Sequence, residues 1–180
     1  MPPAHTAIED LLGQAIAHLN AGQREHARRL CEQAVATHPP HPAVQQLLAV
    51  MALQDGNALA ATELASASLA LRPTHTPTRR LAADAWFELS VQRHQRADLT
   101  GEIQALKAAL KFAPERAEAE VNLGIALQDS GDIEAAMHAY GRAYRLRQDT
   151  FGRIAHALAT PNVGRLWLNL EGLHAALRAT

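Results

Sequence analysis

The sequence of 180 residues is poor in cysteine, in aromatic residues and in net charge. Its single cysteine, Cys31, cannot form an internal disulfide, so no disulfide framework is expected. The 17 basic and 18 acidic residues leave a net charge of −1. This balance argues against a general nucleic-acid or anionic-membrane binder, because both use a basic field. No apolar run reaches membrane-spanning length and no signal-peptide pattern opens the chain, so we expect a cytoplasmic protein.

Signatures of catalysis are also missing. The sequence contains no G-x-x-x-x-G-K-[ST] phosphate loop, no G-x-S-x-G elbow and no H-E-x-x-H pair. Ten histidines invite a metal hypothesis, but His41 and His75 lie 34 residues apart and no cysteine or carboxylate completes a ligand set beside them. We therefore expect solvated turn histidines, no metal, no cofactor and no enzymatic activity.

Apolar and helix-forming residues are abundant. Apolar residues make up 48% of the chain and charged residues 19%, a composition typical of an ordinary globular domain. Apolar residues recur at helical spacing near the N-terminus, at Ile8, Leu11, Leu12, Ala15, Ile16 and Leu19. A second helix comes next with the same spacing, and it places Cys31 on the inward face as a small apolar group. No stretch shows sustained strand alternation, so the sequence predicts an all-α fold.

A period of 34 residues organises the first part of the chain. Three markers repeat at this distance, namely a turn glycine, a small residue early in the second helix and a closing proline: Gly22 and Gly56, Ala27 and Ala61, Pro39 and Pro73. Self-similarity at a fixed period of this length indicates a repeat architecture. The markers place repeats at about residues 8–41 and 42–75.

The third unit is longer than the first two. Its closing proline, Pro114, follows Pro73 by 41 residues, so the unit at about residues 76–116 contains seven extra residues. We place them between its two helices, around residues 92–99, and expect the first helix to continue to about Gln95. In this unit Glu102 occupies the position where a small residue is expected.

Residues 117–150 show the repeated unit most clearly, as two helices joined at Ser130-Gly131-Asp132. This segment resembles a tetratricopeptide repeat (TPR), a 34-residue helix–turn–helix unit with recurring W, L-G, Y, A-x3-F and P positions. The matching residues are Leu123, Gly124, Ala136 and Tyr140. Two positions depart from the pattern, since Glu120 stands where tryptophan is expected and Gln148 replaces the closing proline.

The resemblance implies a right-handed α-solenoid of about four TPR units over residues 8–150, because a single repeat cannot bury its own apolar face. Residues 151–180 are expected to form a C-terminal capping helix, at 151–159, and a tail. Asn169 could cap a final helix that ends near Ala179. The tail does not match the repeat, and Trp167 within it would either anchor the tail to the last repeat or dock into the groove.

The resemblance also implies a non-enzymatic protein-interaction module whose first helices line a peptide-binding groove. Mapped onto this chain, the groove positions are Leu12, Ile16, Asn20, Gln46, Val50, Leu53, Arg80, Asp84, Phe87, Asn122, Ile125 and Asp129. Such a mixed surface suits an amphipathic helix or an extended peptide with apolar anchors. The alternative for its apolar members is packing between neighbouring first helices. The residues with which some TPR domains clamp a C-terminal carboxylate are absent, so recognition of that kind is not expected.

The role of such a module stays open at this level. The first hypothesis is an adaptor, assembly factor or small chaperone that holds a partner peptide or helix in the groove. The second is a structural scaffold that self-associates into a homo-oligomer, and a third is the recognition subunit of a larger enzyme complex. In each case the expected partner is a protein or peptide, not nucleic acid or membrane.

Overall fold

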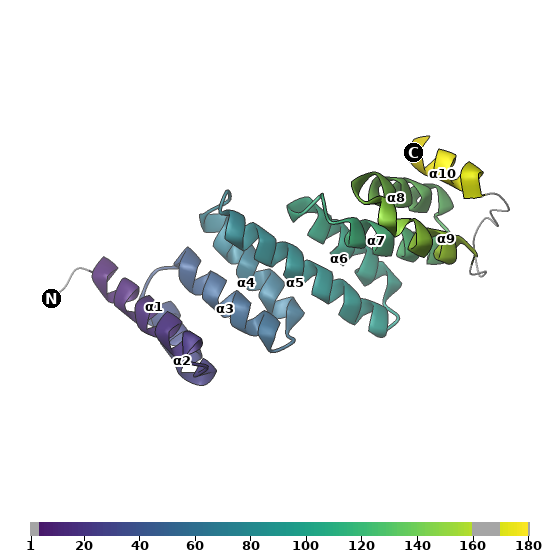
Figure 1. Cartoon of the computed structure of the whole chain (residues 1–180). Helices are drawn as coiled ribbons and strands as arrows, with labels where there is room; N and C mark the ends of the chain where they lie inside the picture. The colour runs from purple at the N-terminus through teal and green to yellow at the C-terminus, as the bar shows by residue number, and fades with distance from the viewer. Residues whose placement is uncertain (1–3, 160–169, 180) are drawn as a thin grey trace. The chain divides into compact units, whose positions relative to one another are not determined.

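A computed structural model describes residues 4–159 and 170–179. The described residues form α-helices and one short 3-10 helix, with no strand among them (Figure 1). In chain order these are α1 (Ala4–Asn20), α2 (Arg24–Thr37), α3 (Pro42–Gln54), α4 (Ala58–Leu71), α5 (Thr76–Gln95), α6 (Leu99–Phe112), α7 (Ala117–Asp129), α8 (Ile133–Leu146), η1 (Gln148–Thr150), α9 (Phe151–Ala159) and α10 (Leu170–Ala179). The prediction of an all-α fold with four helix–turn–helix units is confirmed.

The same three-residue turn separates the two helices of every unit, at residues 21–23, 55–57, 96–98 and 130–132. Three turns place a glycine at positive φ, with values of 74° at Gly22, 75° at Gly56 and 87° at Gly131. Only glycine adopts this left-handed conformation without steric cost. The third turn has Ala97 at this position, with φ of 55°.

An N-cap fixes the start of the second helix in three units. The side chains of Asn57, Asp98 and Asp132 each accept a hydrogen bond from a backbone N–H three residues further on, at distances of 3.1, 2.9 and 3.1 Å. Such caps satisfy an N–H group that has no partner inside the helix. The turns and caps explain why one helix ends and the next begins at these points.

The seven extra residues of the third unit lie in helix α5. This helix has 20 residues, whereas α3 and α7, the first helices of the second and fourth units, have 13 each. The expected end near Gln95 is confirmed, but the turn after it is no longer than the others. The insertion therefore lengthens a helix by about two turns and does not form a loop between helices.

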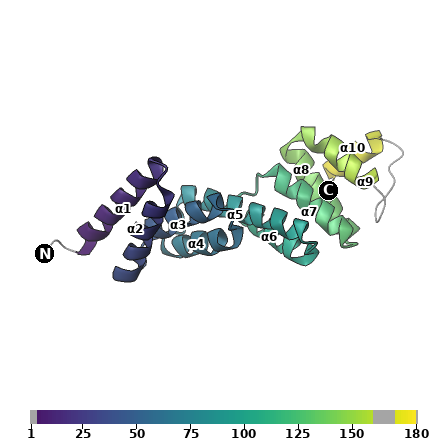
Figure 2. The ribbon, with the colours of Figure 1, turned by 90° about the horizontal axis from the view of Figure 1, so that it is seen from below.

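The chain divides into two compact units, Met1–Ala85 and Trp86–Thr180. In the first, α1 packs against α2 and α3 against α4, as Figures 1 and 2 both show. A cluster of buried side chains joins α1, α2 and α3 and consists of Ile8, Leu12, Ala15, Ala27, Cys31, Ala34, Val44 and Met51. Cys31 is 1% exposed, which confirms its placement on the inward face.

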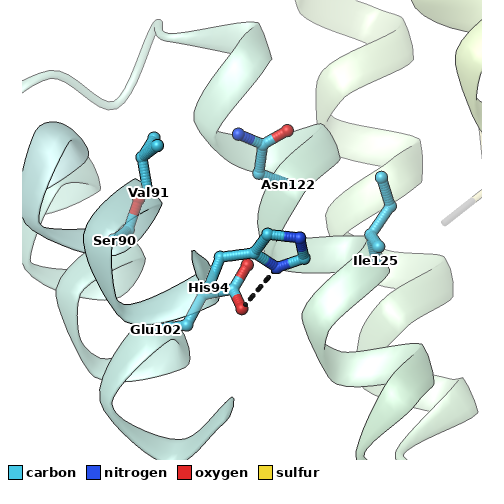
Figure 3. A pocket seen from close by; sticks show the side chains of 6 residues that line it. All are labelled: Ser90, Val91, His94, Glu102, Asn122 and Ile125. Atoms are coloured by element: carbon cyan, nitrogen blue, oxygen red, sulfur yellow. Dashed lines mark hydrogen bonds and ion pairs between the residues drawn. The ribbon is translucent and has the colours of Figure 1, made fainter. Parts of the chain in front are cut away.

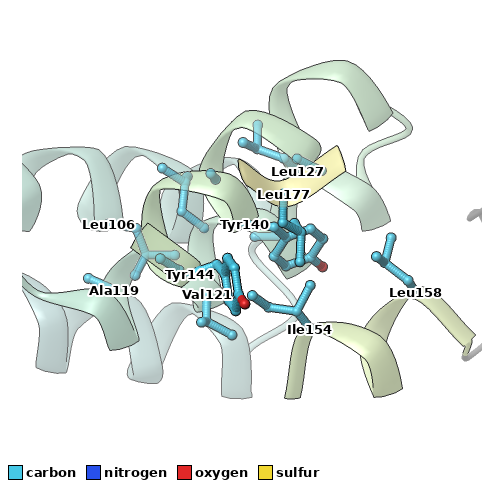
Figure 4. Close-up of a cluster of buried hydrophobic side chains, with 14 of the residues drawn as sticks. Leu106, Ala119, Val121, Leu127, Tyr140, Tyr144, Ile154, Leu158 and Leu177 are labelled. Atoms are coloured by element: carbon cyan, nitrogen blue, oxygen red, sulfur yellow. The ribbon is translucent and has the colours of Figure 1, made fainter. Parts of the chain in front are cut away.

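In the second compact unit, Trp86–Thr180, one larger cluster joins α6, α7, α8, α9 and α10 (Figure 4). Tyr140 of α8 is fully buried at its centre, and Ile154 of α9 and Leu177 of α10 are also 0% exposed. Each later helix covers the apolar face of an earlier one, as repeats of this kind require.

The C-terminal helices confirm part of what we expected. Helix α9 occupies residues 151–159 as predicted, and α10 reaches Ala179. Helix α10 packs on α8 through Leu173 and Leu177, and its His174 ring stacks on Phe151 with 3.6 Å between ring centroids. Asn169 and Trp167 lie outside the described residues, and the boundary at residue 150 between repeats and tail stays a prediction. No described helix is both long enough and apolar enough to span a bilayer.

Candidate functional site

The predicted groove residues of the first compact unit, Met1–Ala85, differ widely in exposure. Leu12 is 9% exposed and belongs to the core of the α1–α2–α3 cluster, whereas Ile16, one turn later, is 43% exposed. Leu53 is partly buried against the cluster of Ala52, Ala61 and Ala85. Of the remaining positions, Gln46 and Val50 are half-buried on α3, and Asn20, Arg80 and Asp84 are exposed.

In the second compact unit, Phe87 of α5 is half-buried against the large core cluster. The Arg116 guanidinium lies over its ring, 4.0 Å from the centroid, in a cation–π contact. Asp129, at the end of α7, is exposed.

Two predicted residues do converge, because Asn122 and Ile125 line the same pocket. The pocket has a volume of about 230 Å³ and lies between α5, α6 and α7 (Figure 3). Its other lining residues are Ser90, Val91, His94 and Glu102. Since Asn122 and Ile125 are three residues apart on α7, they present one helix face to the pocket.

The extension of α5 supplies the opposite wall. Val91 and His94 both lie in the last two turns of this helix, which are the turns that the 13-residue first helices lack. Ser90 is 2% exposed, and its hydroxyl donates to the backbone carbonyl of Phe87 at 2.6 Å, so it is already satisfied within its own helix.

Glu102 is the buried acidic residue among those that line this pocket. It is 7% exposed and occupies the place where the other units have Ala27, Ala61 and Ala136, each 1% exposed or less. His94 Nδ1 lies 3.0 Å from Glu102 Oε2, as the dashed line in Figure 3 marks. Because His94 itself is 65% exposed, the pair joins a buried carboxylate to a solvated ring.

Asn122 forms a contact with the capping helix α9. Arg153 Nη2 donates to Asn122 Oδ1 at 3.0 Å. With its oxygen engaged, the Asn122 amide has its NH₂ group to offer as a donor.

A buried network holds α9 beside α7. The Tyr140 hydroxyl donates to Gln128 Oε1 at 3.0 Å, and Gln128 Nε2 donates to the Ala157 carbonyl at 2.9 Å. Burial raises the pKa of Tyr140 well above its ordinary value, with a smaller contribution from Asp129. The hydroxyl therefore stays protonated and remains a donor throughout the neutral range.

Sequence reasoning missed Ser90, Val91, His94 and Glu102. The signals that point to them were nevertheless present, because the insertion contains His94 and the departure from a small residue marks Glu102. They could be combined only once the insertion was known to extend α5.

The turn histidines are less solvated than expected. His38, His41 and His75 are half-buried, and His75 Nδ1 lies 2.8 Å from the Thr78 hydroxyl. Within residues 4–159 and 170–179, no three His, Cys, Asp or Glu side chains gather closely enough to hold a metal ion.

No family model and no curated protein matches the sequence. Solved structures do match. A crystal structure of MamA protein is 17% identical over 98% of this chain and 87% of that chain, with a TM-score of 0.60. MamA from Desulfovibrio magneticus RS-1 is 19% identical over 79% and 76%, with a TM-score of 0.52.

A thermophilic TPR protein of Thermus thermophilus is 20% identical over 83% of this chain and 80% of that chain, with a TM-score of 0.45. At these identities the likeness to the MamA structures concerns the fold alone. Together with the 34-residue period and the repeated helix–turn–helix units, it shows that this chain has a TPR-like helical repeat fold.

Proposed function

We propose that the protein is a non-enzymatic interaction module that binds a segment of a partner polypeptide at the pocket between α5, α6 and α7. The observation that carries the proposal is the convergence of Asn122 and Ile125 with the extension of α5 around one recess. It combines apolar walls with a few polar groups, the composition typical of a recognition site.

The size of the pocket favours a side chain over a whole small molecule. Small-molecule sites have volumes of roughly 300–1,000 Å³. The present pocket, at about 230 Å³, is smaller, so it suits an anchoring side chain of a peptide whose backbone passes outside. An adaptor, assembly factor or small chaperone would use such an anchor.

A pull-down from lysate of the source organism, read by quantitative mass spectrometry, tests the proposal. It compares the unaltered chain with Val91→Trp, which fills the pocket from the α5 wall. The matched control is Gln104→Trp, which places the same side chain at an exposed position of α6. We expect a partner that is retained by the unaltered chain and by the control, and lost from Val91→Trp.

Equal recovery of every partner by Val91→Trp would refute binding at this pocket. Enrichment of the protein itself, with no other partner, would favour the self-associating scaffold instead. The variants must match the parent chain in helical circular dichroism, so that loss of binding reports on the pocket and not on unfolding.

A further inference from the structure

We propose that the pocket selects a basic side chain, lysine or arginine, of the partner polypeptide, with Glu102 as its counter-ion. This inference rests on the proposed function and adds the chemistry of the anchor. The bound cation would lie with its aliphatic stem between Val91 and Ile125 and its charged group at the Glu102 carboxylate.

The position of Glu102 is the first reason. Its counterparts in the other three units are buried alanines, which allow the two helices of a unit to approach closely. A carboxylate at such a position loses most of its hydration, and a buried carboxylate requires a compensating donor. Within the described part of the chain, the His94 ring is the one side chain that supplies such a donor, and it binds Glu102 Oε2.

The His94 contact is easily exchanged. The ring is 65% exposed, and it lies on the last turn of α5. Moving such a side chain into solvent loses little buried surface. A lysine or arginine of a partner could then take its place and donate to the carboxylate from a permanently charged group that carries several N–H donors.

The walls fit the rest of such a side chain. Val91 and Ile125 are half-buried and give the pocket apolar sides above the carboxylate. Lysine and arginine have the same arrangement, because an apolar stem leads to a charged end. The NH₂ group of Asn122, a residue that lines the pocket, would donate to a backbone carbonyl of the bound segment.

The charges around the pocket favour a cation over an anion. Glu102 is the one residue with a formal charge among those that line the pocket, and Arg93 beside it is already paired with Asp98 at 2.7 Å. An acidic ligand would instead approach the Glu102 carboxylate, and two like charges at close range repel each other.

The test is a selection of random twelve-residue peptides displayed on phage against the full chain. Enriched sequences are synthesised, and their affinities are measured by fluorescence anisotropy against the unaltered chain, Glu102→Gln, His94→Ala and Val91→Trp. Glu102→Gln keeps the size and hydrogen-bonding capacity of the side chain and removes its charge. The control is Glu134→Gln, the same change at an exposed position of α8.

We expect enriched peptides that share a lysine or arginine, and a loss of affinity of about tenfold with Glu102→Gln, as for one charge-assisted hydrogen bond. His94→Ala should raise the affinity, because it removes the competing donor, and Glu134→Gln should leave it unchanged. If Glu102 had a merely structural role, Glu102→Gln and His94→Ala would not change the peptide affinity in opposite directions.

Three results would overturn the inference. Peptides that lose binding with Val91→Trp but share no basic residue and keep their affinity with Glu102→Gln would refute the cation and leave the proposed function standing. Failure to enrich any peptide, or binding unaffected by Val91→Trp, would refute both.

Discussion

The ring of Tyr140 lies against the backbone of Gly124, so closely that a Cβ atom at Gly124 would come within 2.4 Å of Tyr140 Cε1. Both residues are buried, and they join the two helices of the fourth unit, α7 and α8. The L-G and A-x3-F positions of the repeat thus form one contact, in which the absence of a side chain on one helix makes room for an aromatic ring on the other.

We therefore expect Gly124→Ala to lower the free energy of unfolding by about 2 kcal/mol, because the added methyl group overpacks a filled core. Urea unfolding followed by circular dichroism measures the change. In a Tyr140→Leu background the penalty should shrink, since the group that the methyl meets is gone. The control is Gly13→Ala in α1, where nothing lies within 4 Å, and there we expect a gain of roughly 0.5–1 kcal/mol. Equal effects at both glycines would contradict the contact.

The turn of the third unit can be improved. Ala97 adopts φ of 55° at the position where the other turns have glycine. The left-handed conformation costs an L-residue roughly 1–2 kcal/mol. Glycine avoids this strain, but it loses more chain entropy on folding than alanine does, which offsets part of the gain. Ala97→Gly should therefore raise stability by about 0.5–1 kcal/mol in thermal unfolding. The reciprocal change, Gly131→Ala, should lower it, although no atom would obstruct the new Cβ. A loss of stability with Ala97→Gly would show that the turn is not strained.

An ion pair occupies the place where the repeat pattern has tryptophan. Glu120 is 5% exposed, and Arg142 reaches it with two hydrogen bonds, Nε to Oε1 at 2.7 Å and Nη2 to Oε2 at 2.9 Å. Removing the arginine alone would leave a buried carboxylate without its donor. We expect Arg142→Met to cost about 1–2 kcal/mol, less than for a fully buried pair because Arg142 is 44% exposed.

A double-mutant cycle checks this expectation. Glu120→Leu combined with Arg142→Met should be more stable than Arg142→Met alone, because the uncompensated charge is gone. Additive losses would mean that the two side chains stabilise the protein independently.

Cys31 should be an unreactive thiol. The pKa of Cys31 is raised to about 11, chiefly by burial and in smaller part by the charge of Glu32, against the opposing effect of Arg28. Because the thiolate is the reactive form, labelling by Ellman's reagent at about pH 8 should be slow in the native protein and fast in urea. Rapid native labelling would show that the helix pair opens readily.

The raised pKa also has a consequence for stability. A group whose pKa is higher in the folded state stabilises the protein below its unfolded pKa, and this contribution is lost as pH rises from about 9 towards about 11. The free energy of unfolding should therefore fall over this range. Cys31→Ala should show a shallower fall, and identical pH profiles would exclude Cys31 as a contributor.

The last helix can be detached by a single change. Leu177 of α10 is 0% exposed in the cluster shared with α8. Leu177→Ala should cost about 2–4 kcal/mol of local stability. Amide hydrogen exchange read by mass spectrometry should then rise in α10 and not in α1. Arg178→Ala, at the exposed neighbour, should change nothing, and protection of α10 unaffected by Leu177→Ala would argue against its docking on α8.

The repeat period was readable from the sequence because each marker has a local physical cause. Gly22, Gly56 and Gly131 are needed for a positive φ, and Pro39 and Pro73 follow the ends of helices because proline lacks the donor N–H. These requirements act within a few residues, so they appear at fixed positions. The helices and their turns could therefore be predicted directly.

The candidate site was less accessible to sequence reasoning. Helical spacing places Leu12 and Ile16 on one face, yet one is buried and the other is 43% exposed, because neighbouring helices and not periodicity decide the exposure. Glu102 and His94 meet only because α5 continues, and an insertion between two helices can equally well form a loop. The long-range packing that brings Asn122 to the same pocket leaves no mark on local sequence.

The length of the insertion in α5 has a consequence for how such a site could arise. Seven residues turn an α-helix by almost two full revolutions, so the helix face drifts by only about 20°. The added residues thus keep the inward and outward sides of the helix in phase with those before them. An insertion of five residues would rotate the rest of the helix by roughly 140° and expose its apolar side. A helix of a repeat can therefore be lengthened by seven residues at a time, and gain new surface, while the packing of its original part stays unchanged.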